Sequence, residues 1–309
     1  MRKTGTVLFI LLVLILSDGF GQRYRPRIKR HEIVFGLGGT AFLGDLGGAN
    51  RYGTNGLRDL DFPSLRPVIQ LGYLYQFRRR WGLKTSLYYA RLRGDDKWTE
   101  ETYRQNRNIN FRSPVIELSS QFEFSIISGG RQGRRYFSLS KQRVGYGIMP
   151  FSLYVFGGVG AFYFNPRGQY EDGKWYSLRP LKTEGQGIAP TRKNYSLIQL
   201  TFPVGIGIKY FINNEWAIGL EYGRRFSFTD YIDDVSKTYF DPDVLETEKG
   251  EVAAYFSNPS ESVDPNHPMH NSTKPGQQRG DPKDKDTYMY GVITIYYKLA
   301  KYSARLFRY

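Results

Sequence analysis

Asp230, Asp233 and Asp234 stand close together in the chain and could offer the hard oxygen ligands that Ca²⁺ prefers. The same carboxylates could instead accept backbone hydrogen bonds within a turn and pair with Arg224 or Arg225. We favour the turn. We therefore expect this cluster to be structural and to hold no metal ion.

The three histidines offer little for catalysis. His267 and His270 have the spacing of a metal-ligand pair, but no third ligand stands nearby, and His31 begins an alternating segment. The chain has no cysteine, which removes thiolate metal sites and cysteine nucleophiles. A catalytic dyad or triad needs a base held beside its nucleophile, and no pattern here supplies one. We predict no enzymatic activity, no cofactor, no metal and no small-molecule substrate.

Charged side chains also interrupt segments in which apolar residues alternate with small or polar ones. Acidic and basic members occur on the same face of these segments, so they could pair in an enclosed interior. We expect such charge pairs among six residues: Lys84, Glu117, Glu123, Lys209, Glu221 and Arg225. An interior closed by these pairs would need no channel function.

Arginine clusters fall between the alternating segments. They could be solvated turns beside anionic lipid, or docking points for an acidic partner through electrostatic complementarity. The candidates for partner docking are Arg78, Arg79, Arg80, Arg131, Arg134 and Arg135.

The segment from Ser196 to Ser236 shows most clearly what positions these residues. One face carries Ile198, Leu200, Phe202, Val204, Ile206, Ile208 and Tyr210, and the other is rich in glycine and polar residues. An Asn-containing turn then leads into a second alternating run, which is typical of a β-hairpin. Runs of about 10 residues suit tilted strands that cross a bilayer. The small residues suit the interior of a narrow barrel.

The whole-chain composition agrees with an exported barrel. The 309 residues include 25 Tyr, 21 Phe and 34 Gly, and the net charge is +15. The basic residues flank the strands instead of gathering on one helix, so we predict no nucleic-acid partner. Residues 1–21 have the charged start, short apolar run and small residues of a signal peptide. Residues 22–30 would then form a basic periplasmic arm.

Period-two alternation recurs over residues 31–298 and predicts an all-β fold, an eight-stranded antiparallel transmembrane β-barrel with long extracellular loops in the outer membrane. The expected strands begin near residues 31, 66, 81, 111, 153, 198, 216 and 288. Residues 231–287 form a long, irregular and flexible loop in this prediction, and residues 299–309 a basic aromatic tail. The connection over residues 128–150 is too long for a usual periplasmic turn.

Several short motifs occur together in the chain: RHEI at Arg30, LGDLG at Leu43, NFRS at Asn110, FGGVGAFYFNP at Phe156, LKTEGQG at Leu181 and FTDYIDDVS at Phe228. Their combination resembles the PorG family, DUF6089-like outer-membrane barrels of the Bacteroidetes type IX protein secretion system. The resemblance makes Asp230, Tyr231, Asp233 and Asp234 a family-motif loop.

The resemblance implies a non-enzymatic outer-membrane component that anchors the periplasmic PorK–PorN ring, in a machine that also supports gliding in some relatives. Outer-membrane lipid and the ring proteins would be its partners. The alternative is a small stand-alone barrel that serves adhesion or envelope stability, for which the outer loops matter and the basic turns do not.

Overall fold

The computed structural model describes residues 30–46, 64–99, 101–129, 134–135, 146–147, 150–260 and 269–299. Eight long strands dominate it: β1 (His31–Leu43), β2 (Arg66–Gln76), β3 (Trp81–Asp95), β4 (Asn110–Ile127), β7 (Phe151–Phe164), β10 (Ile198–Phe211), β11 (Trp216–Ser227) and β12 (Thr287–Lys298). The predicted strands are confirmed.

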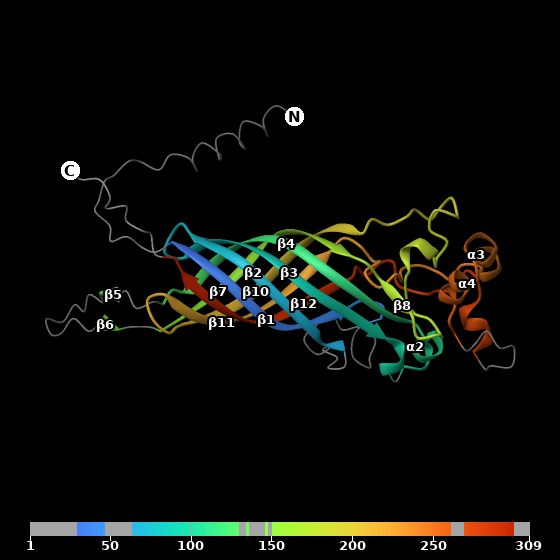
Figure 1. Ribbon diagram of the computed structural model, residues 1–309, viewed down its shortest axis with the longest axis horizontal. Coiled ribbons are helices and arrows are strands. Elements are labelled where there is room, and N and C mark those ends of the chain that lie inside the picture. The colour runs from blue at the N-terminus through green and yellow to red at the C-terminus, as the bar shows by residue number, and fades with distance from the viewer. Residues whose placement is uncertain are drawn as a thin grey trace, which may run out of the picture.

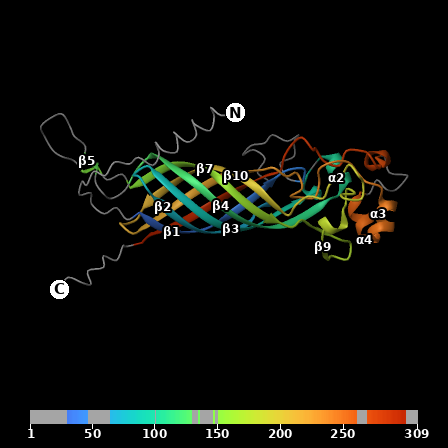
Figure 2. The same ribbon diagram turned by 90° about the horizontal axis from the view of Figure 1, so that it is seen from above.

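The eight strands close into one antiparallel barrel (Figures 1 and 2). Their order is β3-β2-β1-β12-β11-β10-β7-β4, and the pairing of β3 with β4 closes the ring. The first and last strands meet along a full ladder, in which Ile33 pairs with Tyr297 and Phe42 with Tyr288. Closure matters in a membrane because it leaves no unpaired strand edge in contact with lipid.

The exterior of the barrel is apolar and its interior is buried. Outward residues such as Leu118, Val159 and Ile198 are 58%, 59% and 65% exposed. Their inward neighbours alternate with them along each strand and are buried. An apolar exterior this large is unfavourable in water and fits the hydrocarbon core of a bilayer. The protein is therefore a transmembrane barrel of the outer-membrane type.

Aromatic side chains border this apolar exterior. Trp81, Tyr210 and Trp216 are exposed at the end that carries the short turns, and Tyr89 and Tyr163 lie towards the opposite end. Girdles of this kind mark the two membrane interfaces. No helix in the described ranges is long and apolar enough to cross a membrane.

We call one end of the barrel the turn end. It carries the short β2–β3 and β10–β11 connections, and Asn213 Oδ1 tightens the second by accepting hydrogen bonds from the backbone of Glu215 and Trp216. The connection between β4 and β7 leaves this end too and contains two paired short strands, β5 (Arg134–Arg135) and β6 (Tyr146–Gly147). Short turns face the periplasm in outer-membrane barrels, so we assign the turn end to that side.

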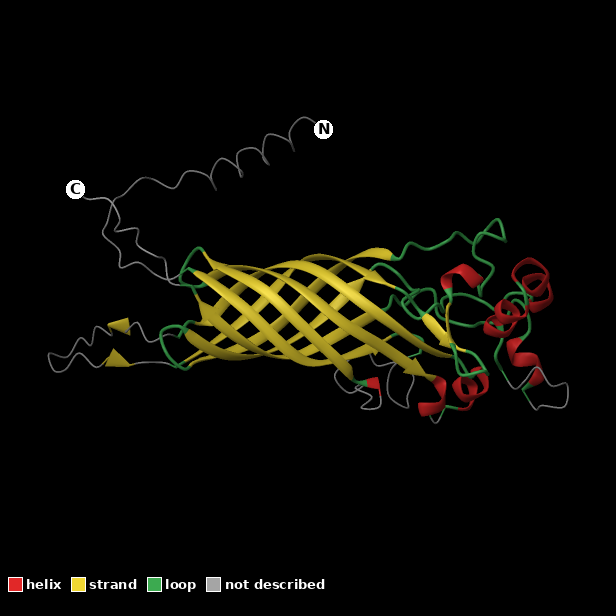
Figure 3. Cartoon of the chain, in the orientation of Figure 1, coloured by secondary structure: helices red, strands yellow, loops and turns green. Residues whose placement is uncertain are grey.

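The opposite end, the loop end, carries the remaining elements (Figure 3). These are η3 (Asp96–Trp98), α2 (Thr102–Arg107), β8 (Arg167–Gln169), β9 (Trp175–Ser177), η4 (Arg179–Leu181), α3 (Pro242–Lys249), α4 (Glu251–Ser257) and η6 (His270–Thr273). Strand β8 extends the sheet beyond β4, and β9 pairs with β8.

The prediction that residues 231–287 are irregular is wrong. Helices α3 and α4 lie within this segment, and Leu245, Ala253 and Phe256 are buried against the rest of the loop end. The sequence held the helix signal, since Asp241 caps α3 and Pro242 occupies its first turn. The proposed signal peptide lies outside the described residues, as do all but the first residue of the tail and all but Arg30 of the arm.

Candidate functional site

The barrel lumen is the first candidate site, and it contains a buried cation. Lys84 of β3 is 0% exposed, and its Nζ lies 2.6 Å from Glu221 Oε1 and 3.0 Å from Glu123 Oε1. Glu221 comes from β11, which lies across the barrel from β3, and Glu123 comes from the adjacent β4. The contact to Glu221 is a hydrogen bond, whereas Glu123 lies at ion-pair distance only.

Two tyrosines complete this group. The hydroxyls of Tyr154 and Tyr296 donate hydrogen bonds of 2.7 and 2.5 Å to Glu221 Oε1, the same oxygen that Lys84 contacts. The two hydroxyls also lie 2.9 Å apart. Because a carboxylate removed from water must have its charge balanced and its lone pairs bonded, these donors allow Glu221 to be buried.

A second ion pair lies nearer the loop end. Arg225 Nε is 3.5 Å from Glu117 Oε2, and Tyr288 donates a 3.0 Å hydrogen bond to that same oxygen. The Arg225 guanidinium also lies over the rings of Tyr290 and Tyr88, at 4.1 and 4.9 Å from their centroids. Aromatic faces attract a cation and partly replace the water that it loses.

A third ion pair lies at the turn end. Lys209 Nζ is 3.0 Å from Glu32 Oε2 and 3.6 Å from the centroid of the Tyr296 ring. The structure thus brings all six predicted lumen residues into three groups. Glu32 is not among the predicted lumen residues, although its alternation with the outward residue Ile33 would have predicted that it points inward.

These groups fill the lumen. Lys84, Glu117, Gln70 and Gln121 are all 0% exposed, which a water-filled pore at these positions would not allow. The interior formed by the described strands contains four glutamates and three cationic side chains. Because the cations are fewer than the glutamates, tyrosine hydroxyls supply additional hydrogen-bond donors. The barrel interior is a packed polar core, not a passage.

The family-motif loop is the second candidate site, and its aspartates are buried at the loop end. Asp233 accepts backbone hydrogen bonds from Leu46 and Val235, at 3.1 and 3.0 Å. Asp234 has a left-handed backbone (φ 67°) and accepts hydrogen bonds from Thr183 Oγ1 (2.6 Å) and the Tyr195 hydroxyl (2.5 Å). The loop therefore ties together segments from three outer connections.

Burial sets the charge state of this loop. It raises the pKa of Asp230 to about 7, with added repulsion from Asp45 and Glu184, and it raises the pKa of Asp234 to about 6. The pKa of Asp233 is also well above its usual range, because burial and the neighbouring Asp45 disfavour its charge. Tyr231 stacks on Tyr195, with the ring centroids 4.7 Å apart.

Arg279 provides a cation for this acidic region. Its Nη1 is 3.1 Å from Glu184 Oε1 and donates a 2.8 Å hydrogen bond to the carbonyl of Asp234. The expected pairing of the aspartates with Arg224 or Arg225 is wrong, because Arg225 pairs with Glu117 inside the barrel and Arg224 donates to Thr287 Oγ1.

A second buried arginine links the same loops. Arg107 lies 2.8 Å from Asp96 Oδ1 and donates hydrogen bonds to the carbonyls of Arg279 (2.8 Å) and Asp45 (2.7 Å). We call the assembly of the family-motif loop with Glu184, Arg107 and Arg279 the outer cap. It joins all four connections of the loop end into one polar network.

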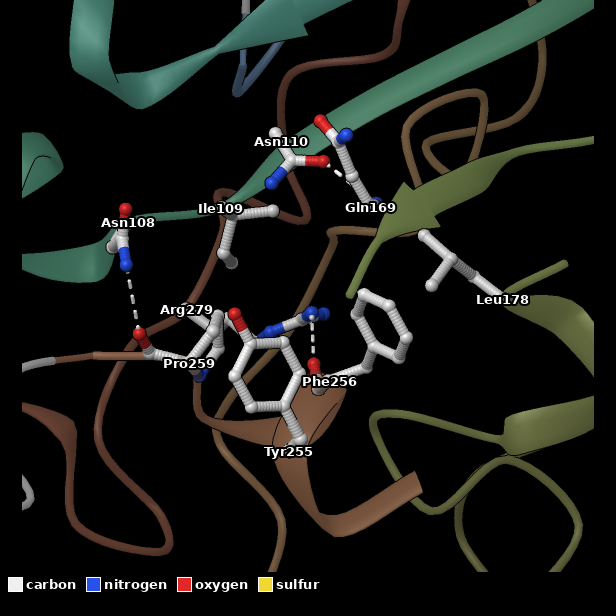
Figure 4. Close-up of a pocket in the computed structure, with 9 residues that line it drawn as sticks. All are labelled: Asn108, Ile109, Asn110, Gln169, Leu178, Tyr255, Phe256, Pro259 and Arg279. Carbon is white, nitrogen blue, oxygen red and sulfur yellow. Dashed lines mark hydrogen bonds between the residues drawn. The ribbon is translucent and has the colours of Figure 1, made fainter. Parts of the chain in front are cut away.

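A small cavity of about 10 Å³ lies beside this network (Figure 4). Arg279, Phe256, Tyr255 and Leu178 are among its lining residues, and the Arg279 guanidinium donates a 3.2 Å hydrogen bond to the Phe256 carbonyl. This volume holds about one water molecule, so the cavity offers no room for an organic ligand.

In the described ranges, no three His, Asp or Glu side chains are placed to hold a metal ion. His267 lies outside these ranges, and only the backbone of His270 is described. The aspartates of the family-motif loop accept hydrogen bonds from backbone N–H groups and hydroxyls, as the turn interpretation predicts.

The candidate docking arginines divide by location. Arg78, Arg79 and Arg80 are exposed in the β2–β3 turn at the turn end. Arg134 and Arg135 form β5, of which the backbone alone is described, and Arg131 lies outside the described residues. By strand order both connections leave the barrel at the same end.

The family model described as a domain of unknown function, DUF6089, matches residues 6–249. No curated protein matches the chain.

Solved structures that align with the chain include outer-membrane proteins. Ail, the attachment invasion locus protein of Yersinia pestis, aligns at 12% identity over 87% of this chain and 97% of its own, with a TM-score of 0.37. Neisserial surface protein A aligns at 8% identity over 87% and 97%, with a TM-score of 0.37. OprG from Pseudomonas aeruginosa aligns at 10% identity over 88% and 99%, with a TM-score of 0.36. Likeness at this level says nothing about function.

Proposed function

The chain belongs to the family described as a domain of unknown function, DUF6089, and from this premise we propose that it is a non-enzymatic outer-membrane component of the type IX protein secretion machinery, where it anchors the periplasmic PorK–PorN ring. The motifs quoted for the PorG family support the secretion role. The filled lumen supports the anchoring role.

The filled lumen is the observation that carries the proposal. Three ion-pair groups and their tyrosine partners occupy the interior, so secreted protein does not pass through this barrel. A rigid, closed barrel is suited to hold a position in the bilayer. Its contribution to secretion would then come from surfaces outside the membrane.

The turn end offers such a surface. Arg78, Arg79 and Arg80 are exposed beside the long β4–β7 connection, which carries Arg134 and Arg135 in β5. Exposed cations at one membrane face would steer an acidic partner and set its orientation. We assign the ring contact to this end.

The test is a mild-detergent pull-down of the tagged protein from outer membranes, with the co-purifying proteins identified. The wild-type protein is expected to recover PorK and PorN. The variant R78Q/R79Q/R80Q and the variant R131Q/R134Q/R135Q are each expected to reduce that recovery. A matched control removes three arginines from the loop end, R93Q/R112Q/R167Q, and is expected to recover the ring fully.

A deletion strain gives the functional readout. The type IX machinery exports proteins that carry a C-terminal sorting domain, and loss of the anchor should stop that export. Normal export would remove the secretion role. If the barrel purifies alone in several detergents and export is normal, the stand-alone role in adhesion or envelope stability is the better description. The outer cap favours that second role, since it is an elaborate ordered structure on the cell-surface side.

A further inference from the structure

A row of like charges crosses the outside of the barrel near the loop end. Arg93 of β3 pairs in register with Arg112 of β4, and Arg112 pairs in register with Arg167 of β8. We call these three residues the arginine row. Arg112 is repelled by Arg167, by Arg91, the neighbouring outward residue of β3, and by Arg93. Like charges directly opposite each other on neighbouring strands are destabilising, so the fold does not account for the row.

The surrounding protein leaves much of this charge without a partner. Asp95 lies 4.0 Å from Arg93 Nη2, at the limit of an ion pair, and no other carboxylate of the described residues lies at ion-pair distance from the row. The Nε–H groups of Arg93 and Arg167 also find no acceptor within the described structure, although both atoms are buried beneath the outer part of the guanidinium groups. A site that supplies several donors and few acceptors is suited to an anion.

Two tryptophans hold two of the three guanidinium groups in place. Arg112 lies 4.0 Å from the centroid of the Trp175 ring, and Arg93 lies 4.9 Å from that of Trp98. Stacking on an aromatic face orients a planar guanidinium and leaves its edge free for bidentate contacts to phosphate. Arg93 and Arg112 are therefore oriented before any ligand arrives.

The height of the row on the barrel indicates the ligand. On β3, Leu87 and Tyr89 face lipid at 47% and 42% exposure, and Arg91 and Arg93 are the next outward residues towards the loop end. Arg93 is four residues beyond Tyr89, roughly 13 Å along a strand and about 10 Å along the membrane normal when the strand is tilted by about 40°. The row thus lies one outward position beyond the apolar exterior, at the level where lipid headgroups lie. Tryptophans also prefer this level.

We propose that the arginine row binds the phosphate headgroup of an anionic lipid in the leaflet at the loop end. Phosphate oxygens would accept hydrogen bonds from the three guanidinium groups and relieve their mutual repulsion, and the acyl chains of the same molecule would lie along Tyr89 and Leu87. The site is separate from the turn-end surface assigned to the secretion ring.

The test uses the full-length mature protein in phosphatidylcholine nanodiscs that contain a small fraction of phosphatidate, with retained lipids counted by native mass spectrometry. The wild type is expected to retain phosphatidate in preference to phosphatidylcholine. The variant R93Q/R112Q/R167Q is expected to weaken that retention at least ~10-fold, since charge-assisted hydrogen bonds are lost. The shifted gel mobility of the unheated barrel reports that it is folded.

The turn end supplies the matched control, because R78Q/R79Q/R80Q removes the same charge from the opposite interface and should leave retention unchanged. The conservative variant R93K/R112K/R167K keeps the charge and should retain part of the affinity, since lysine lacks the planar fork. Equal losses in the two glutamine variants, or none in the first, would overturn the proposal. Displacement of the lipid by inorganic phosphate would overturn it too, in favour of a soluble phosphate ligand.

Discussion

Lys84 and Glu221 meet across the barrel, 137 residues apart in sequence, with 2.6 Å between Nζ and Oε1. They come from β3 and β11, which are separated by three strands in the sheet. The contact therefore crosses the interior and does not follow a hydrogen-bonded ladder. It joins the two sides of the barrel at the centre of the polar core.

Replacing Lys84 with methionine is expected to lower the free energy of unfolding by ~3–5 kcal/mol, because it leaves Glu123 and Glu221 buried without their cation. Urea titration of the barrel in lipid vesicles measures the loss. The double variant K84M/E221Q should be less damaging than K84M alone, since it removes one stranded charge. A double variant as unstable as the sum of both single changes would contradict the pairing.

The filled lumen predicts the absence of ion conduction. In planar bilayers the folded protein should give no conductance steps above those of the bare membrane, since the interior at Lys84, Glu117 and Gln70 is closed to water. Reproducible single-channel steps from the wild type would show that the core opens.

Gly158 of β7 lies where strands approach too closely for a side chain. A Cβ added there would stand 2.1 Å from the backbone oxygen of Ser120 on β4, which accounts for the glycine-rich motif of this strand. Gly158→Ala should cost ~1–3 kcal/mol through overpacking. Gly291→Ala is the matched control, since nothing lies within 4 Å of the added atom, and it should change stability by less than ~1 kcal/mol.

The outer cap should be more stable at mildly acidic pH. An unfolded aspartate titrates near ~3.9, whereas the pKa of Asp230 is raised to about 7 and those of Asp45 and Asp234 to about 6. From ~pH 4 to ~pH 7 the native cap therefore holds more protons than the unfolded loops, and its free energy of unfolding falls as the pH rises. Above ~pH 7 the contribution of these three aspartates levels off.

Hydrogen exchange of residues 230–236 at pH 5 and pH 7.5, corrected for the intrinsic rate, measures this dependence. Protection should be greater at pH 5. The variant Asp230→Asn stays neutral at both pH values. The pH dependence of the free energy of opening should therefore become smaller, by ~1.4 kcal/mol for each pH unit that separates the native and unfolded pKa of Asp230. Greater protection at pH 7.5 in the wild type would contradict the direction of these pKa changes.

Arg279→Ala should loosen the outer cap and leave the barrel intact, because Glu184 would remain buried without the cation that Arg279 supplies. Limited proteolysis of intact vesicles should cut the loop-end connections faster than in the wild type, with unchanged thermal unfolding of the strands. Lys283→Ala, at an exposed position of the same connection, is the control and should behave like the wild type.

The strands and their faces could be read from the sequence because a side-chain period of two directly encodes which residues point inward. Ile198, Leu200 and Phe202 face outward as their alternation predicts, and Lys209 on the other face points into the lumen. The outer loops have no such alternation, so this rule predicts nothing about them. The helices of residues 242–257 have a capping residue and a proline as local signals. They form against a surface built by other loops, so the alternation of the strands could not predict them.

The sequence by itself determined a closed membrane barrel, since eight alternating strands with one apolar face have no other way to satisfy their backbone in lipid. It also determined that charges would be buried inside. Only the tertiary structure decided which charges meet, because closure and register set which strands oppose each other. Lys84 reaches Glu221, Lys209 reaches Glu32, and Arg279 replaces the nearer Arg224 and Arg225 in the cap, across separations that no local pattern encodes.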